Sequence, residues 1–341
     1  MKKILIALSG GVDSSVAAGL IKDKYDCIGA TMKLYCSNDK DIKDAEAICK
    51  KINIPFHLLD FEDKFKSTVI NDFIETYENG GTPNPCIVCN RILKFGSLLD
   101  KAKELGCDGI ATGHYARIEE KKGRFCIRKA ADLTKDQSYV LYSLSQEQLS
   151  KTIFPLGEMS KSDARIIADE LEFVNSQKKE SMDICFVPDG DYFKFIENYT
   201  GKKFKKGYFK DKDGNILGTH KGIIKYTIGQ RKGLGLALPQ PMYVCEKNVE
   251  KNEVILCTND ELFENEVIVN NFNWVSIANP NKEFKALAKI RYNMKEQPCT
   301  IIPTSDTSVK IIFDEPQRAI TKGQSAVVYF DDYVIGGGII E

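Results

Sequence analysis

Two stretches of the chain carry side chains whose types and spacing suit chemistry. The first is Ala7–Ser15, which reads Ala-Leu-Ser-Gly-Gly-Val-Asp-Ser-Ser and lies between an apolar run, Ile4–Leu8, and a segment with apolar residues at helical spacing. This context predicts a strand, a tight turn and a helix. Gly10 and Gly11 allow positive φ and leave room for a ligand against the backbone.

The helix expected after this turn would present its first backbone N–H groups to an anion at the end of the first strand. Ser14 and Ser15 stand where such a helix needs side-chain caps. The segment lacks the Gly-Lys-Ser/Thr ending of a Walker P-loop. From the residues alone, an ordinary Gly-Gly turn between strand and helix is the alternative.

The second stretch is a Cys-x-x-Cys pair, Cys86 and Cys89, which precedes a helix expected from about 90 to 105. At the start of a helix the dipole favours the thiolate, and Arg91 and Lys94 add positive charge. We therefore expect the pKa of Cys89 to be lowered.

A third thiol, Cys185, lies in the loop-like segment 181–188. Three chemistries suit this set of thiols. In sulfur transfer, one cysteine carries a persulfide and another resolves it as a disulfide. As metal ligands, three thiolates leave a fourth position open. The third possibility is that the thiols are structural.

Length and composition describe a globular protein of two or three domains, since 341 residues with 43% hydrophobic content are ample for packed cores. We expect a cytoplasmic enzyme, because no apolar run approaches the roughly 18 residues of a membrane helix and the start of the chain has no cleavage site. Eleven cysteines, an odd number, argue against a disulfide framework. Six stand in apolar or strand-like settings and are expected in the core: Cys27, Cys49, Cys107, Cys126, Cys245 and Cys257.

The charge is balanced overall but not locally. Net charge is zero, yet the segment from Lys202 to Lys232 holds ten Lys/Arg and only two acids, a net of +8. Aromatic residues are interleaved with these cations. Such a patch is either an electrostatic footprint for a phosphate backbone or a solvated loop region.

The first 60 residues alternate strand and helix, with strands expected at 27–32 and 55–59 and a helix at 39–51. This pattern predicts a parallel sheet covered by helices, whose ligand lies beyond the carboxyl ends of the strands. Further along we expect a short strand at 109–112 and helices at about 64–77, 137–144 and 161–171.

After about residue 200 the pattern changes to short apolar runs spaced by Asn, Asp, Gly and Pro, which is typical of a β-barrel or sandwich. The runs are 243–245, 254–256, 267–269, 286–288, 309–312 and 326–329. We expect three domains, spanning 1–198, 199–264 and 265–341.

Six motifs in order connect these features: Ser-Gly-Gly-Val-Asp-Ser, Thr-Pro-Asn-Pro-x-x-x-Cys-Asn, Gly-His-Tyr, Lys-Asp-Gln, Ile-Cys-Phe-Val and Gly-Gln-Arg-Lys-Gly-Leu-Gly. Together they resemble the bacterial tRNA-uridine 2-sulfurtransferases (MnmA/TrmU family) from residue 3 to about residue 330. The resemblance implies an α/β fold, in which a parallel-sheet PP-loop ATP pyrophosphatase domain precedes a small basic β-rich domain and a C-terminal β-barrel.

The resemblance also implies roles for individual residues. ATP, with Mg²⁺, would be bound by Ala7, Leu8, Ser9, Gly10, Gly11, Val12, Asp13, Ser14, Met32 and Gly113. The target base would enter a pocket lined by Asn84, Pro85 and Cys86. The tRNA anticodon stem-loop would contact His114, Lys135, Asp136, Gln137, Arg291, Tyr292 and Gln324. Without the resemblance, His114 reads as a loop histidine stacked on Tyr115, and the last three residues read as solvent-facing.

The implied reaction thiolates the wobble uridine of the Lys, Glu and Gln tRNAs in two steps. The uracil 2-oxygen attacks the α-phosphate of ATP, and pyrophosphate leaves. A persulfide on Cys185 then supplies sulfur to the activated carbon, AMP leaves, and Cys89 closes a disulfide with Cys185. A cysteine desulfurase or sulfur carrier would provide the sulfur.

One departure from the family pattern concerns Cys86, because many members carry Asp at this position. A thiol does not act as a carboxylate base near neutral pH without strong perturbation. The three thiols Cys86, Cys89 and Cys185 therefore leave open an iron–sulfur cluster whose free iron holds hydrosulfide. Two further alternatives are another PP-loop ligase or amidotransferase and a non-enzymatic RNA-binding or metal-sensing protein.

Overall fold

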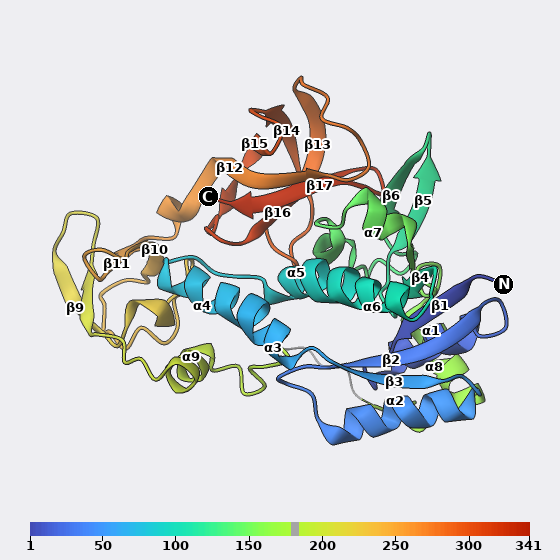
Figure 1. Ribbon diagram of the computed structural model, residues 1–341. Coiled ribbons are helices and arrows are strands. Elements are labelled where there is room, and N and C mark those ends of the chain that lie inside the picture. Colours follow the sequence, from blue (N-terminus) through green and yellow to red (C-terminus); the bar gives the residue numbers. More distant parts are fainter. Residues whose placement is uncertain (179–183) are drawn as a thin grey trace.

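The computed structural model describes residues 1–178 and 184–341 and begins with a parallel sheet (Figure 1). Its strands lie in the order β3-β2-β1-β4-β7 and are all parallel. Their bounds are β1 Lys3–Ala7, β2 Asp26–Lys33, β3 Phe56–Asp60, β4 Gly109–Ala111 and β7 Thr152–Ile153. The central strand β1 is a continuous apolar run because both faces of the sheet are covered.

Helices cover the two faces of this sheet. On one face, α1 (Val12–Ile21), α2 (Asp39–Lys51) and α8 (Lys161–Glu170) pack against Ile4 and Ile6. On the other face, Leu5 belongs to the core that contains the remaining helices. These are α3 Glu62–Phe65, the π-helical η1 Lys66–Ile70, α4 Asn71–Glu78, α5 Pro85–Cys89, the π-helical η2 Asn90–Ser97 and α6 Leu98–Glu104. A short 3₁₀ helix, η3 (Ser138–Leu141), and a short α-helix, α7 (Gln146–Ser150), follow.

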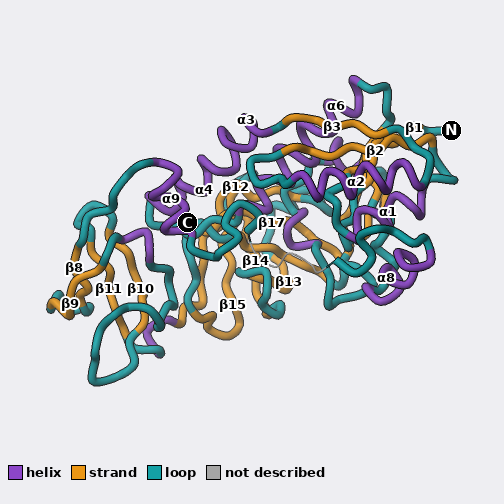
Figure 2. The backbone as a smooth tube through the Cα atoms, turned by 90° about the horizontal axis from the view of Figure 1, so that it is seen from below, coloured by secondary structure: helices purple, strands orange, loops and turns teal. Residues whose placement is uncertain are grey.

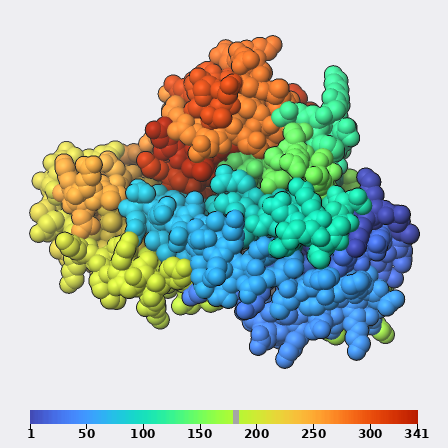
Figure 3. All heavy atoms as spheres, viewed as in Figure 1, coloured from blue at the N-terminus to red at the C-terminus, as the bar shows by residue number. Residues whose placement is uncertain are grey.

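A smaller sheet forms a lobe at one side of the molecule, to the left in Figure 3. The helix α9 (Tyr192–Thr200) leads into it, and its strand order is β10-β11-β8-β9. The strands are β8 Gly207–Lys210, β9 Ile216–His220, β10 Tyr243–Asn248 and β11 Glu253–Cys257, with the 3₁₀ turns η4 Ile223–Lys225 and η5 Asp260–Leu262. Only β11 and β8 pair in parallel among these strands as described.

The C-terminal strands close a barrel in the order β12-β15-β14-β13-β16-β17, because β17 pairs again with β12 (Figure 2). The bounds are β12 Phe263–Trp274, β13 Phe284–Lys289, β14 Gln297–Pro303, β15 Ser308–Arg318, β16 Ser325–Phe330 and β17 Tyr333–Ile340. The hairpin β5 (Arg117–Lys121) and β6 (Arg124–Arg128) extends this sheet through the β6–β17 pairing.

The expected fold class is confirmed, while several local expectations are wrong. The helix expected from about 90 begins at Pro85, which fits the first helical position because proline lacks an N–H that would remain unpaired there. The helix expected over 137–144 is only the turn η3. The hairpin β5–β6 was not expected, and it ties the first expected domain to the barrel of the third. The three domain bounds stay predictions.

None of the helices in the described part of the chain has the length and apolar character needed to cross a lipid bilayer.

Candidate active site

The glycine-rich loop lies at the carboxyl end of β1, between β2 and β4. This is the point where the strand order of the sheet reverses, and ligands of open parallel sheets bind there. Gly10 has a φ of +71°, and a Cβ at this position would overlap the backbone of Asp41. The sequence therefore places glycine where only glycine fits.

The helix α1 after this loop is capped differently from expected. Gly11 is its N-cap and, among the described residues, no side chain caps it. The hydroxyls of Ser14 and Ser15 instead donate to the Gly11 carbonyl, at 3.0 and 3.1 Å. The expectation that these serines cap the helix is therefore wrong, and the first-turn N–H groups keep the arrangement that suits an anion.

Asp13 is held in place beside the loop. Its carboxylate accepts a hydrogen bond from the Tyr115 hydroxyl at 2.8 Å and forms an ion pair with Lys161 at 2.7 Å. Gly113 lies against the same segment, because a Cβ there would stand 2.7 Å from backbone atoms of Asp13 and Ser14. The predicted nucleotide residues Asp13 and Gly113, distant in sequence, are thus neighbours. Met32, near the end of β2, is partly buried at the same sheet edge.

Asn175 and Lys178, which the sequence analysis did not single out, hold the glycine-rich loop in place through hydrogen bonds. Asn175 Nδ2 donates to the Gly10 carbonyl and to Ser15 Oγ, both at 2.9 Å. Lys178 Nζ donates to the Gly10 carbonyl at 2.9 Å and pairs with Asp41 and Asp44. Burial lowers the pKa of Lys178, but the hydrogen bonds to the two aspartates outweigh it and raise the pKa overall. No periodic pattern in the sequence marks these positions.

The pKa values of the thiol pair, Cys86 and Cys89, differ from the expectation. Because the helix begins at Pro85, Cys86 lies in the first turn and Cys89 is the last residue of α5. Burial raises the pKa of Cys89 to about 11, with Lys94 opposing it. Burial also raises the pKa of Cys86, again opposed by Lys94. The expected lowering of the Cys89 pKa is therefore wrong: desolvation outweighs the charge of one lysine.

Cys185 lies in the same neighbourhood and has a partner that the sequence did not reveal. Its thiol lies near that of Cys36, in the turn after β2, and the two thiols perturb each other's pKa. The neighbouring thiol is the largest cause of both pKa shifts, raising the pKa of Cys185 and lowering that of Cys36. Cys86 and Cys89 also interact electrostatically with Cys185, so the four thiols form one group.

The iron–sulfur alternative stays a prediction. Among the described residues, no group of three or more His, Cys, Asp or Glu side chains is arranged to hold a metal ion. All eleven cysteines are free thiols. Of the six cysteines expected in the core, Cys245 is partly exposed and the other five are buried.

The residues predicted to bind the target base and tRNA form contacts between the nucleotide domain and the barrel. Gln324 Nε2 donates to the carbonyls of Thr82 at 2.9 Å and Pro83 at 3.2 Å, just ahead of Asn84 and Pro85. The barrel thus fixes the segment that enters α5.

Arg291 and Tyr292 are also engaged rather than free in solvent. Arg291 donates to the Ala319 carbonyl and to Thr321 Oγ1, and burial lowers its pKa. The Tyr292 hydroxyl donates to the Asp136 carbonyl at 3.2 Å, and 39% of this residue is exposed. The reading of Arg291 as merely solvent-facing is therefore wrong, whereas Tyr292 is exposed as that reading expected.

The Lys135-Asp136-Gln137 segment is ordered by its own side chains. Asp136 accepts hydrogen bonds from the backbone N–H groups of Ala130 and Ser138, at 3.0 and 3.2 Å. Gln137 Oε1 accepts one from the Tyr115 N–H at 3.0 Å. Lys135 is partly buried beside them.

His114 lies in the core. Its ring packs between Phe95 and Phe154, with centroids 5.6 and 5.8 Å away, rather than on Tyr115. Nδ1 is 2.7 Å from Thr112 Oγ1, and burial holds the pKa of His114 well below its usual value. The predicted tRNA contact of His114 stays a prediction, and it requires the ring to leave this packing.

The basic segment lies in the side lobe and is only partly neutralised. Four of its lysines pair with acids: Lys202 with Glu78, Lys203 with Glu197, Lys210 with Glu253 and Lys212 with Glu261. Among the described residues, the other six cations of the segment form no ion pair. This leaves positive charge for a phosphate backbone.

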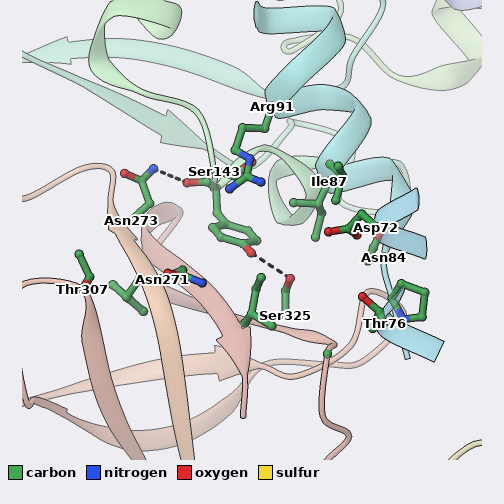
Figure 4. Close-up of a pocket in the computed structure, with 16 residues that line it drawn as sticks. Asp72, Thr76, Asn84, Ile87, Arg91, Ser143, Asn271, Asn273, Thr307 and Ser325 are labelled. Atoms are coloured by element: carbon green, nitrogen blue, oxygen red, sulfur yellow. Dashed lines mark hydrogen bonds between the residues drawn. The ribbon is translucent and has the colours of Figure 1, made fainter. Parts of the chain in front are cut away.

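A cavity of about 380 Å³ separates the helices from the barrel (Figure 4). Asn84, Ile87 and Arg91 line its helical side and Ser325 lines its barrel side. Neither Cys86 nor Cys89 contributes to the lining, because these residues lie on another face of α5. The cavity is thus separate from the thiol group.

The fold and the loop define a class of protein, a nucleotide-binding α/β domain of the HUP type that carries two β-rich appendages. The profile of the tRNA methyl transferase HUP domain matches residues 2–189, that of the tRNA methyl transferase PRC-barrel domain 193–258, and that of the aminomethyltransferase β-barrel domain 264–340.

Curated relatives match over the full length. The tRNA-specific 2-thiouridylase MnmA of Clostridioides difficile (strain 630) is 47% identical, over 100% of this chain and 98% of the relative. The enzyme of the same name from Clostridium botulinum (strain Alaska E43 / Type E3) is 48% identical with the same coverage. A solved structure, the U34-tRNA thiolase NcsA from Methanococcus maripaludis with its 4Fe–4S cluster, is 20% identical with a TM-score of 0.37, over 58% of this chain and 66% of that one. The chain belongs to the MnmA family of tRNA-specific 2-thiouridylases.

Proposed function

We propose that this chain is an ATP-dependent tRNA-uridine 2-sulfurtransferase that thiolates the wobble uridine of the Lys, Glu and Gln tRNAs. The proposal rests on one observation in a member of this family: a loop suited to bind an anion and a group of thiols lie at the same edge of the parallel sheet. The anion-binding loop follows β1, and a thiol group that includes Cys185 lies around the turn after β2.

ATP fits the loop at the start of α1. The free N–H groups of the first turn suit the pyrophosphate that leaves, and Lys178 supports the loop from below. The carboxylate of Asp13 is an oxygen ligand of the kind that Mg²⁺ prefers, and Tyr115 and Lys161 orient it. Bound Mg²⁺ would neutralise phosphate charge.

The uracil 2-oxygen attacks the α-phosphate, so that a poor leaving group becomes AMP. Asn84, Pro85 and Cys86 receive the extruded base, and Gln324 fixes the backbone just ahead of them. A persulfide on the exposed Cys185 then donates sulfur to carbon 2, and Cys89 closes the disulfide that a reductant resets. A cysteine desulfurase or a sulfur carrier supplies the sulfur.

The anticodon stem-loop is bound by cations of the side lobe and by the barrel. The positive segment between Lys202 and Lys232 supplies phosphate contacts, and the half-exposed ring of Tyr292 offers a stacking surface. His114, Arg291 and the segment Lys135–Gln137 are the remaining proposed tRNA contacts.

The test is reconstitution of the full-length protein with ATP, Mg²⁺, an unmodified Lys tRNA transcript and a cysteine desulfurase with cysteine. We expect 2-thiouridine in the digested tRNA, measured by mass spectrometry, and its loss in Cys185→Ser and Asp13→Ala. Cys245→Ser, remote from the site, serves as the control. A folded protein that forms no 2-thiouridine contradicts the proposal, whereas iron-dependent thiolation lost in Cys86→Ser favours the cluster alternative.

A further inference from the structure

The short segment ahead of α5, Gly80–Pro83, is where three parts of the protein meet; we call it the entry segment. Residues 81–84 belong to no helix or strand, so their position depends on what they contact. From the nucleotide domain, the Thr76 carbonyl accepts a hydrogen bond from the Gly81 N–H at 2.8 Å. From the barrel, the Lys322 carbonyl accepts one from the Thr82 N–H, also at 2.8 Å.

The side lobe reaches the entry segment through β10 and the turn that follows it. Lys247, on β10, donates a hydrogen bond from Nζ to the Gly81 carbonyl at 3.3 Å. Val249 lies against the neighbouring residue, because a Cβ on Gly80 would stand 3.0 Å from Val249 Cγ2. The carbonyl and the backbone of the entry segment are thus in direct contact with the side lobe.

Stability alone does not account for a lysine at position 247. The side chain is partly buried, and among the described residues it forms no ion pair and its one hydrogen bond is the bond to Gly81. Burial lowers the pKa of Lys247 to about 8, because desolvation penalises the ammonium group and no acid opposes this effect. Burying a cation without an acid destabilises the folded protein, whereas its hydrogen bond to a carbonyl is charge-assisted and directional.

Local side chains do little to fix the chain between the entry segment and α5. Asn84 is the N-cap residue of α5, but among the described residues its side chain makes no capping hydrogen bond. Thr82 Oγ1 is buried and, within the same described residues, has no hydrogen-bond partner. The place at which α5 begins is therefore set by bonds from other parts of the fold, among them Lys247 on one side and Gln324 on the other.

We propose that Lys247 is a positioning residue, which holds the entry segment from the side lobe and thereby places Asn84, Pro85 and Cys86 for the target base. The inference rests on the proposed function, because it requires these three residues to receive the base. Gln324 holds the same segment from the barrel. The base pocket thus has its working geometry only when both β-rich domains are packed on the nucleotide domain.

The experiment compares Lys247→Met with wild type in the full-length protein. Methionine keeps an unbranched apolar stem and removes the ammonium group. We expect single-turnover 2-thiouridine formation at saturating tRNA to fall about tenfold, because the base is misplaced, while tRNA affinity in filter binding changes less than about twofold. Lys247→Arg keeps the charge and the donors and should restore the rate to within about threefold of wild type. Lys251→Met is the matched control, since Lys251 is exposed in the turn between β10 and β11 and carries the same charge.

Hydrogen–deuterium exchange of the tRNA-free proteins tests the positioning without any activity. We expect peptides that cover residues 79–86 to exchange faster in Lys247→Met than in wild type or Lys251→Met, while peptides of β1 exchange at the same rate in all three. Equal exchange over 79–86 overturns the inference, as does an unchanged rate at saturating tRNA. Weaker tRNA binding with an unchanged single-turnover rate also overturns it, because Lys247 would then be a phosphate contact. A wild-type protein that forms no 2-thiouridine contradicts the proposed function instead, and the exchange measurement still decides whether Lys247 positions the entry segment.

Discussion

Gly113→Ala is the substitution whose effect the structure defines most sharply. The new methyl group would stand 2.7 Å from backbone atoms of Asp13 and Ser14, while carbon contacts are comfortable at about 3.5–4.0 Å. The obstacle is the backbone of the Asp13–Ser14 peptide, so a side-chain rotation cannot relieve it. The loop after β1 must therefore move by about 1 Å.

A displacement of this size has a large effect on a reaction that depends on position. Misplacing reacting groups by about 1 Å costs about 100-fold in rate, which is about 2.7 kcal/mol of transition-state stabilisation. Overpacking should also lower the free energy of unfolding by about 1–3 kcal/mol. We therefore expect Gly113→Ala to fold but to form 2-thiouridine about 100-fold more slowly.

The assay is single-turnover 2-thiouridine formation with saturating tRNA, alongside ATP binding by calorimetry and a thermal melt. Gly19→Ala is the matched control. Gly19 lies on α1, the helix that also carries Asp13 and Ser14, and its Cβ would meet only the side-chain ends of Leu171 and Phe173. If Gly113→Ala keeps the wild-type rate and ATP affinity, the placement of Gly113 against the nucleotide loop does not matter for the reaction. The reasoning from the close approach would then be wrong.

Three further predictions follow from the site. Gln324→Ala removes two hydrogen bonds to the segment before Asn84, so stability should fall by about 1–2 kcal/mol and tRNA use should fall while ATP binding is retained; equal losses of both in filter binding would contradict this. The pKa of Cys89 is raised from 9.0 to about 11 in the folded protein, so the stability that this thiol contributes is present below pH 9 and is lost as the pH rises toward 11. The rate at which Cys89 is alkylated, followed by mass spectrometry, should therefore still increase between pH 9 and 10. His114 should remain neutral at pH 6, so its ring signals in NMR should not titrate near 6.5, and Thr112→Val, which removes its hydrogen bond, should destabilise the protein by about 1 kcal/mol in urea unfolding.

The sequence by itself determined the parallel sheet, the glycine-rich loop and the strand-rich second half. These features are written in local patterns: an apolar run ahead of Gly10, amphipathic spacing over 39–51, and short apolar runs between turn residues. Such patterns report which side chains are buried, and burial on one face or two sets the type of element. The order of six motifs then indicated the family, which the full-length relatives confirm.

Only the tertiary structure decided which thiols meet. Cys36 and Cys185 lie far apart in the chain, and neither carries a local signal for the other. The segments that carry them are brought together because Tyr35, next to Cys36, and Phe186, next to Cys185, both pack on Phe195. The pKa of Cys89 was misjudged for the same reason. Helix position and nearby lysine are visible in the sequence, but desolvation depends on what packs around the side chain after folding.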